Sequence, residues 1–366
     1  MEILRVAQKV YPDVQGGAPY HVHAMSRDQA AMGHDVTVLS IRHEPSLPHV
    51  ETRDGYSVVR FDPVASPLGN ALSPALASFL RRVGRPDVLH AHSHLYAATN
   101  LAAFESTLSD VPLAITNHGL FSQNAPRWLF DGYLRSLGRW TFDAADVVFC
   151  YTDVDRERLA SYGVSSDVAV VPNGVDTSEF TPEGPTSDRI EPGGAAVVFV
   201  GRLVRGKRPD EALSILERVR RRRPDATLYI CGDGPLRAEL VRQVGEDGGV
   251  VFLGHVPAEE MPALYRSVDA LVLPSRAEGL PRTVLEAQAC GVPVVASSLD
   301  QLRSVQTHVD RLVEPGDLDG FADAVCSVIE DPQPIAANDG RQVDRSWERT
   351  VEETTRVLSR LAESGS

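Results

Sequence analysis

The 366-residue chain has little lysine, few cysteines and no long apolar run. Lys9 and Lys207 are its only lysines, so arginine carries nearly all of its positive charge, as GC-rich codon usage would produce. The scattered cysteines argue against a disulfide or zinc framework and predict reduced, buried thiols. They are Cys150, Cys231, Cys290 and Cys326. No segment approaches the roughly 18 apolar residues that a membrane-spanning helix requires.

Charge and composition exclude other classes. A net charge of -14 argues against a nucleic-acid binder, which normally presents a basic face. A hydrophobic fraction of 43% with 23% charged residues is typical of a soluble globular protein, and the length allows two domains. The start, Met1 to Arg5, lacks the pattern of a signal peptide, so we expect a cytoplasmic protein.

Strand-like and helix-like segments alternate through both halves of the chain, which predicts parallel sheets with helices on both faces. Proline and glycine are dense in 177–194, which we interpret as a linker. We therefore expect one domain over 1–176 and a second over 195–345. The remaining segment, 346–366, has the apolar stripe of an amphipathic helix.

The most informative segment is Ser275 to Glu286, which follows a predicted strand and leads into a predicted helix. Glu278 falls in the loop and Glu286 on the helix. Ligands of open α/β sheets lie at this edge, where helix N-termini attract anions. Arg202 and Lys207 follow another predicted strand. Two cations, a helix N-terminus and two carboxylates together suit a nucleoside diphosphate that carries a sugar.

Together with landmarks elsewhere, this segment resembles the retaining glycosyltransferases of family 4 (glycosyl transferases group 1). The landmarks, in chain order, are Gly16-Gly17, 33–39, 90–92, 116–119 and 172–176. The resemblance covers nearly the whole chain. It implies an α/β protein of the GT-B fold, with two facing Rossmann-like domains and an interdomain cleft. It also implies that the helix over 346–366 crosses back onto the N-terminal domain.

The same resemblance implies a role for each site residue. Arg202 and Lys207 would hold the diphosphate, Glu278 the hydroxyls of the donor sugar, and Glu286 the ribose. His118 would contact the donor sugar near the acceptor site. Gly16 and Gly17 would let the backbone approach a phosphate. The remaining donor-binding positions are Val256, Gly279, Leu280, Thr283 and Val284.

Two other enzyme classes fit the same residues less well. Retaining glycosidases need carboxyl groups about 5 Å apart, whereas eight helical positions separate Glu278 and Glu286 by roughly 12 Å. The segment 201–207 nearly spells a P-loop, but Arg208 and Pro209 stand where a hydroxyl residue should hold magnesium.

Two candidate metal sites also have simpler explanations. Asp153 and Asp155 match an Asp-x-Asp motif, yet the preceding Thr152 suits a helix cap with acidic residues in the first turn. His90, His92 and His94 would share one face of a strand, where they could ligate zinc, with His118 as a further ligand. We favour polar lining of the cleft and expect no metal and no cofactor.

A segment from Arg127 to Trp140 combines aromatic residues with arginines, as interfacial membrane helices do. Core packing of its aromatic side is the preferred interpretation, and peripheral contact with the inner face of the membrane is the alternative. One stretch, 298–303, departs from the family pattern of two glycines followed by a glutamate. That departure concerns a loop that would lie near the donor.

The predicted function is therefore a retaining, metal-independent hexosyltransferase. It would move a sugar from a nucleoside-diphosphate sugar to an acceptor sugar, a glycolipid or a small molecule, in glycoconjugate, glycolipid or polysaccharide synthesis. Two alternatives stay open. One is a nucleotide-sugar 2-epimerase of the same fold, and the other is a catalytically silent partner that binds a sugar nucleotide.

Overall fold

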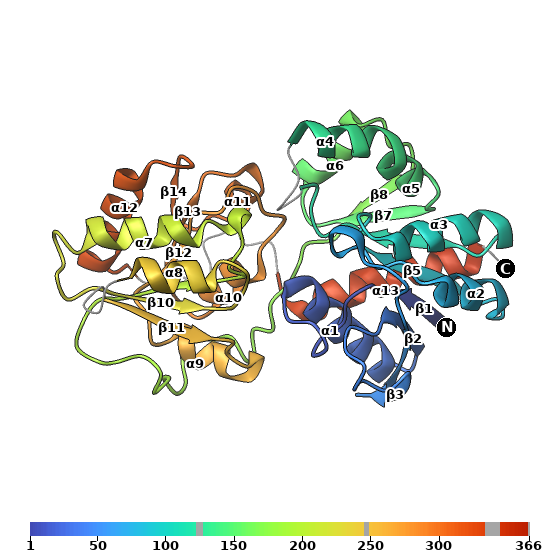
Figure 1. Ribbon diagram of the computed structural model, residues 1–366, viewed down its shortest axis with the longest axis horizontal. Helices are drawn as coiled ribbons and strands as arrows, with labels where there is room; N and C mark the ends of the chain where they lie inside the picture. The colour runs from blue at the N-terminus through green and yellow to red at the C-terminus, as the bar shows by residue number, and fades with distance from the viewer. Residues whose placement is uncertain (122–126, 245–248, 334–344, 365–366) are drawn as a thin grey trace. The chain divides into compact units, whose positions relative to one another are not determined.

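The computed structural model describes residues 1–121, 127–244, 249–333 and 345–364, and it divides into two compact units (Figure 1). The first unit contains Met1–Leu120, the described residues up to Pro172, and the chain from Glu348 onward. The second unit begins at Asn173 and ends at Trp347. The segment 177–194, which we interpreted as a linker, therefore lies within the second unit.

The sheet of the first unit has the strand order β3-β4-β2-β1-β5-β6-β7-β8. Only the pairing of β3 with β4 is antiparallel. The strands are β1 Glu2–Val6, β2 Asp35–Ile41, β3 Val50–Arg53, β4 Tyr56–Phe61, β5 Val88–His92, β6 Leu113–Thr116, β7 Val147–Cys150 and β8 Asp167–Val170. The α-helices of this unit are α1 Gly17–Ala31, α2 Pro74–Arg82, α3 Ala97–Ser109, α4 Arg127–Tyr133, α5 Arg139–Asp143, α6 Asp153–Ser161 and α13 Trp347–Ser364.

Alternation along the strands gives this sheet two buried faces. Leu4 and Val6 of β1 pack into one core cluster, which also contains Leu76 of α2. Ile3 lies in the other cluster with Leu358 of α13. Successive side chains of a strand point to opposite faces, so helices must cover both sides of a parallel sheet.

Two elements differ from the sequence-based expectation. The hairpin of β3 and β4 turns at Asp54-Gly55, where both residues have positive φ, the pattern of a type I′ turn. The segment from Arg127 to Trp140, which we compared with an interfacial helix, is not one helix, because α4 and α5 are joined by a π-helix, Leu134–Gly138. By contrast, the predicted cap of α6 is present, because Thr152 Oγ1 accepts from the Asp155 backbone N–H over 3.2 Å.

The sheet of the second unit is wholly parallel, with the order β11-β10-β9-β12-β13-β14. Its strands are β9 Ala196–Val200, β10 Thr227–Cys231, β11 Val250–Gly254, β12 Ala270–Leu273, β13 Val294–Ser297 and β14 Arg311–Val313. Its α-helices are α7 Pro209–Val219, α8 Arg237–Gln243, α9 Met261–Tyr265, α10 Arg282–Ala289, α11 Asp300–Arg303 and α12 Leu318–Glu330.

This strand order is that of a doubly wound nucleotide-binding fold, in which the direction of winding reverses between β9 and β12. Val197 and Phe199 of β9 share a core cluster with Leu216 of α7 and Phe321 of α12. The loops that leave β9 and β12 therefore flank the switch point, where ligands of such sheets bind. All four cysteines of the chain are free and buried, as predicted.

Candidate functional site

The switch point of the second unit brings Lys207 and Glu278 together. Lys207 ends a 3₁₀ turn, Arg205–Lys207, in the loop after β9, and Glu278 lies in the loop after β12. The Arg276 N–H donates to the Gly206 carbonyl over 2.9 Å, which ties the two loops together. Lys207 Nζ donates to Glu278 Oε1 over 2.5 Å, and their side chains are 17% and 4% exposed. Sequence reasoning gave the two residues separate roles and did not predict this ion pair.

Arg202 lies in the same loop, with an exposed side chain. The backbone beside it is packed tightly against the loop after β10, since the Leu203 N–H donates to the Asp233 carbonyl over 2.9 Å. Gly232 has φ +133°, and a Cβ there would overlap the Gly201 carbonyl. Sequence analysis missed this contribution. The Gly232-Asp233-Gly234 triplet directly after a predicted strand was the available signal.

Glu286 lies in a separate environment, on the first turns of α10. The Tyr265 hydroxyl donates to its Oε2 over 3.1 Å, and Arg282 Nε donates to its Oε1 over 3.2 Å. Burial and the neighbouring carboxylate raise the pKa of Tyr265 well above its usual value, which keeps the hydroxyl a hydrogen-bond donor. Neither partner of Glu286 was predicted. The Tyr265 contact depends on how α9 and α10 pack, whereas the Arg282 contact joins residues four apart on α10, a spacing that was available in the sequence.

The N-terminal end of α10 carries the other predicted donor-binding positions. Gly279, Leu280 and Val284 are buried, and no side chain caps the helix. The Val284 N–H already donates to the Pro281 carbonyl over 3.1 Å. Thr283 Oγ1 is buried and has no hydrogen-bond partner among the described residues. This hydroxyl is therefore a better-placed donor to a ligand than the Val284 N–H.

Two further positions concern the surroundings of the site. Val256 is buried beyond β11, and its backbone hydrogen-bonds to the Cys231 thiol. The unusual stretch 298–303 folds into the short helix α11, held to β14 by a 2.7 Å hydrogen bond from the Ser298 N–H to the Val313 carbonyl. Arg303 also donates to Ser298 Oγ over 2.5 Å, so this departure from the family pattern has a defined structure.

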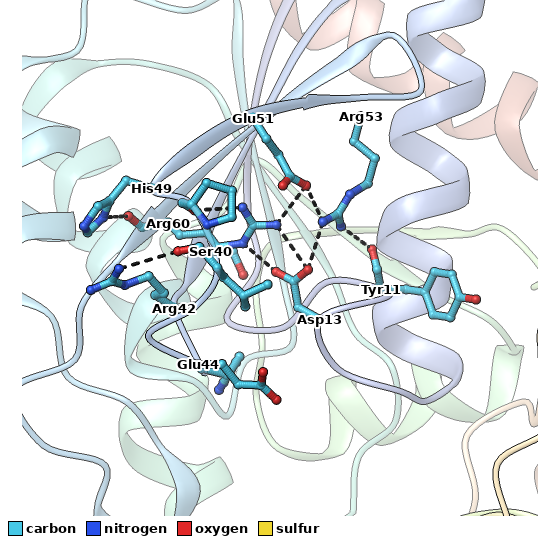
Figure 2. Close-up of polar contacts among 12 residues, drawn as sticks. Tyr11, Asp13, Ser40, Arg42, Glu44, His49, Glu51, Arg53 and Arg60 are labelled. Carbon is cyan, nitrogen blue, oxygen red and sulfur yellow. Dashed lines mark hydrogen bonds and ion pairs between the residues drawn. The ribbon is translucent and has the colours of Figure 1, made fainter.

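In the first unit, Gly16 and Gly17 form the start of α1. Gly16 has φ +138°, a conformation that other residues rarely adopt. The loop that leads to it is fixed by Asp13, which lies between Arg53 and Arg60 (Figure 2). Arg60 Nε contacts Asp13 Oδ2 at 2.6 Å, and Arg53 donates to the Tyr11 carbonyl over 2.5 Å.

This ion-pair cluster is buried on the side of the aspartate. The side chains of Asp13 and Arg60 are 2% and 0% exposed. Glu51, on β3, forms ion pairs with both Arg53 and Arg60. Burial opposes ionisation of Asp13, but hydrogen bonds from Arg60 and Arg53 hold its pKa below its usual value. The β3–β4 hairpin, which we did not predict, thus secures the glycine loop.

His118 lies at the end of β6, within a cluster of buried rings. His92 Nδ1 is 3.1 Å from His118 Nε2, and the Tyr151 hydroxyl is 2.7 Å from His118 Nδ1. Desolvation lowers the pKa of His118 to about 4 and that of His94 to about 3, and it lowers those of His90 and His92 well below normal. These rings are therefore neutral at neutral pH.

The alternative of a zinc site receives no geometric support in the part of the chain that the structure describes. Within it, no group of three or more His, Cys, Asp or Glu side chains is placed to hold a metal ion. His90 instead lies 2.7 Å from Thr116 Oγ1 and 3.3 Å from the buried guanidinium of Arg5. β5 therefore directs His90 and His92 into a hydrogen-bonded cluster, whereas His94 lies beyond the end of the strand and packs against the rings of Tyr133 and Phe142.

The aromatic segment of α4 and α5 is only partly packed. Trp128 is 74% exposed and Trp140 is 41% exposed, so core packing does not account for both tryptophans. Arg135 lies over the ring of Tyr162, and Arg139 pairs with Asp143 at 3.1 Å. Among the described residues, no helix combines the length and the apolar character needed to cross a membrane.

Comparison with known proteins identifies the family. Residues 15–179 match the family described as Glycosyltransferase Family 4, and residues 194–331 match Glycosyl transferases group 1. Glycogen synthase of Mycobacterium tuberculosis (strain ATCC 25618 / H37Rv) is 31% identical, over 98% of this chain and 94% of that protein. Phosphatidyl-myo-inositol mannosyltransferase of Mycolicibacterium smegmatis is 29% identical, over 96% and 92%.

Solved structures share the fold. Sucrose-phosphate synthase from Thermosynechococcus elongatus superposes with a TM-score of 0.82 at 20% identity, over 99% of both chains. Anabaena HepE in complex with UDP-glucose superposes with a TM-score of 0.80 at 21% identity, over 98% of this chain and 99% of that one. The two α/β units are thus those of a GT-B glycosyltransferase. More particularly, the chain belongs to glycosyltransferase family 4 and transfers a sugar from a nucleotide sugar, which confirms the predicted family and fold.

Proposed function

We propose that this protein is a retaining hexosyltransferase, which moves a hexose-type sugar from a nucleoside-diphosphate sugar to an acceptor hydroxyl. The observation that best supports this proposal is the Lys207–Glu278 pair at the switch point. An ammonium group suits a diphosphate, and a buried carboxylate accepts strong hydrogen bonds from sugar hydroxyls. Donor binding would exchange the ion pair for these two contacts.

The sequence relatives support the substrate class. Their names include glycogen synthase, phosphatidyl-myo-inositol mannosyltransferase and D-inositol 3-phosphate glycosyltransferase. These names indicate that relatives of this chain transfer sugars to different acceptors. For this protein we accordingly propose glycoconjugate, glycolipid or polysaccharide synthesis as the wider role, with the acceptor to be found by experiment.

The proposed chemistry is a front-face displacement. Arg202, Lys207 and the start of α10 would stabilise the negative charge that grows on the leaving diphosphate. Glu278 would orient the sugar and Glu286 the ribose. A phosphate oxygen of the leaving group would take the proton of the attacking hydroxyl, so no added acid or base is required.

From the first unit, we assign His118 to the donor sugar and the backbone at Gly16 and Gly17 to a phosphate. The glycines provide backbone N–H groups without side chains that would block an anion. The neutral His118 ring would meet the donor sugar without adding charge. These assignments follow the family resemblance and agree with the chemistry of each residue.

The first test is thermal stabilisation of the purified protein by UDP, GDP, ADP and their sugar conjugates, with a chelator present. A ligand at a hundred times its dissociation constant adds about 2.7 kcal/mol of stability. We expect one base to stabilise selectively, and its sugar conjugate to stabilise further. Stabilisation that needs an added divalent ion would contradict the metal-independent mechanism.

Glu278→Gln then separates sugar recognition from nucleotide binding. It should abolish transfer and remove the extra stabilisation by the sugar conjugate, while stabilisation by the free nucleotide persists. Glu217→Gln, which changes an exposed carboxylate of α7, is the matched control. Equal loss of both stabilisations in Glu278→Gln would argue against a sugar-specific role. Epimerisation of the donor without any acceptor would overturn the transferase proposal.

A further inference from the structure

Both ring nitrogens of His118 already have partners within the first unit. Tyr151, which directly follows β7, places its hydroxyl 2.7 Å from Nδ1. His92, the last residue of β5, places its Nδ1 3.1 Å from Nε2. A histidine with two fixed partners has its tautomer chosen by them, because one nitrogen must donate and the other must accept.

The surrounding rings also hold the plane of His118. The His92 ring is stacked at a centroid separation of 5.3 Å and an interplanar angle of 25°. The ring of His21, from α1, meets His118 edge-on at 5.3 Å and 82°. Tyr151 completes the cluster at 5.9 Å. Rotation of the imidazole would disturb each of these contacts.

The ring nitrogen of His92 that faces away from His118, Nε2, indicates which groups in this cluster donate and which accept. His92 is 2% exposed, and its Nε2 has no partner among the described residues. If Tyr151 donated to His118 and His118 donated to His92, that Nε2 would carry a buried N–H with no acceptor. If instead His92 donated to His118 and His118 donated to Tyr151, His92 Nε2 would carry no hydrogen and would be only an acceptor without a donor. Buried N–H groups without a partner are the rarer of the two.

We propose that Tyr151 and His92 are positioning residues that hold His118 as the Nδ1–H tautomer. His92 Nδ1–H donates to His118 Nε2, and His118 Nδ1–H donates to the Tyr151 oxygen. This inference rests on the proposed function in one respect, since it assigns the ring orientation of a histidine that would meet the donor sugar. The tautomer itself is a property of the free protein.

The direct test is long-range proton–nitrogen NMR of the full chain labelled with ¹⁵N-histidine, at pH 7.5. Comparison with His118→Gln assigns the His118 signals. We expect a protonated Nδ1 and an unprotonated Nε2 in the wild type. An Nε2–H tautomer, or a mixture of the two, would overturn the inference whether or not the protein shows transfer.

Kinetics of the variants give the second readout. Tyr151→Phe should shift the His118 tautomer and lower kcat about ten- to hundredfold, the cost expected when a residue that orients a functional histidine is lost. Tyr133→Phe is the control, because its hydroxyl also makes a close contact, donating to the His94 carbonyl over 2.5 Å. We expect the control to keep the wild-type tautomer and kcat.

A second pair of variants covers the case in which Tyr151→Phe folds poorly. His92→Asn retains a side-chain N–H near the position of Nδ1, whereas His92→Leu does not. We expect the asparagine variant to keep the Nδ1–H tautomer and most of kcat, and the leucine variant to lose both. Equal kcat in the two variants would overturn a positioning role for His92. Complete absence of transfer by the wild type, with the expected tautomer, would contradict only the proposed function.

Discussion

The Lys207–Glu278 ion pair permits a quantitative test of the site. Replacing Lys207 with methionine removes the ammonium group and leaves the Glu278 carboxylate, 4% exposed, without its partner. Removal of one member of a buried pair typically costs about 3–5 kcal/mol. Because the Lys207 side chain is 17% exposed, we expect the lower end, about 3 kcal/mol of unfolding free energy.

The double variant separates stability from chemistry. Lys207→Met with Glu278→Gln replaces both charges with neutral groups of similar size, which is often close to neutral for stability. We therefore expect the double variant to regain most of the free energy that Lys207→Met loses. Turnover should not return, because the double variant lacks both the cation that faces the diphosphate and the carboxylate that holds the sugar. Loss of one such group lowers turnover at least about a hundredfold.

Urea unfolding measures the first quantity, and release of nucleoside diphosphate in the presence of acceptor measures the second. The donor is the sugar nucleotide that stabilises the protein most. If turnover returned together with stability in the double variant, neither the lysine nor the carboxylate would be required for transfer, and both proposed roles would be wrong. Wild-type turnover in Lys207→Met would remove the lysine from the chemistry altogether.

Three other predictions follow from particular contacts. Asp13→Asn should lower the unfolding free energy measured in urea by about 3 kcal/mol and raise the donor KM. Asp62→Asn is the control, because its side chain is 56% exposed, and it should change stability by less than about 1 kcal/mol. Equal effects of the two substitutions would refute the anchoring role of Asp13. Gly232→Ala should lower the melting temperature far more than Gly33→Ala. Both glycines have positive φ, but only at Gly232 would the added Cβ meet backbone atoms. Similar losses in the two variants would argue against the close approach of the Gly232 and Gly201 backbones. The lowered pKa values of His118 and three neighbouring histidines mean that the unfolded chain binds more protons than the folded chain. Stability that is present above pH 6.5 should therefore fall on acidification toward pH 4, by at most about 1.4 kcal/mol per pH unit for each ring that stays neutral. Urea midpoints that stay constant between pH 7.5 and 5.5 would show that these rings are not held neutral.

Sequence reasoning predicted the fold because strand and helix periodicities are local properties. Each predicted parallel strand follows from a short apolar run, and the alternation with helices dictates a doubly wound sheet. The one antiparallel strand, Val50–Arg53, was missed although Asp54-Gly55 is a strong hairpin signal. The π-helix, Leu134–Gly138, was missed because it depends on packing rather than on any local break in the pattern.

The candidate site, like the fold, was predictable only in part. Topology alone places Lys207 and Glu278 at one edge, because both follow strands that flank the switch point. Which atoms pair is a different question, decided by loop geometry at Gly206 and Arg276, and no pattern in the sequence encodes it. The Tyr265 partner of Glu286 was unpredictable for the same reason, whereas Arg282 lies four residues before Glu286 on one helix and could have been predicted.

The histidines show most clearly where local reasoning ends. Alternation along β5 predicts that His90, His92 and His94 share a face, and this pattern alone allows either a metal site or a hydrogen-bonded cluster. The choice depends on what the neighbouring elements contribute to that face. Here Arg5 contributes a buried cation beside His90, which disfavours a second cation there, and Tyr151 contributes a hydroxyl to His118. Arg5 lies on β1 and Tyr151 directly follows β7, so the chemistry of these histidines is decided by the assembled sheet and not by the strand that carries them.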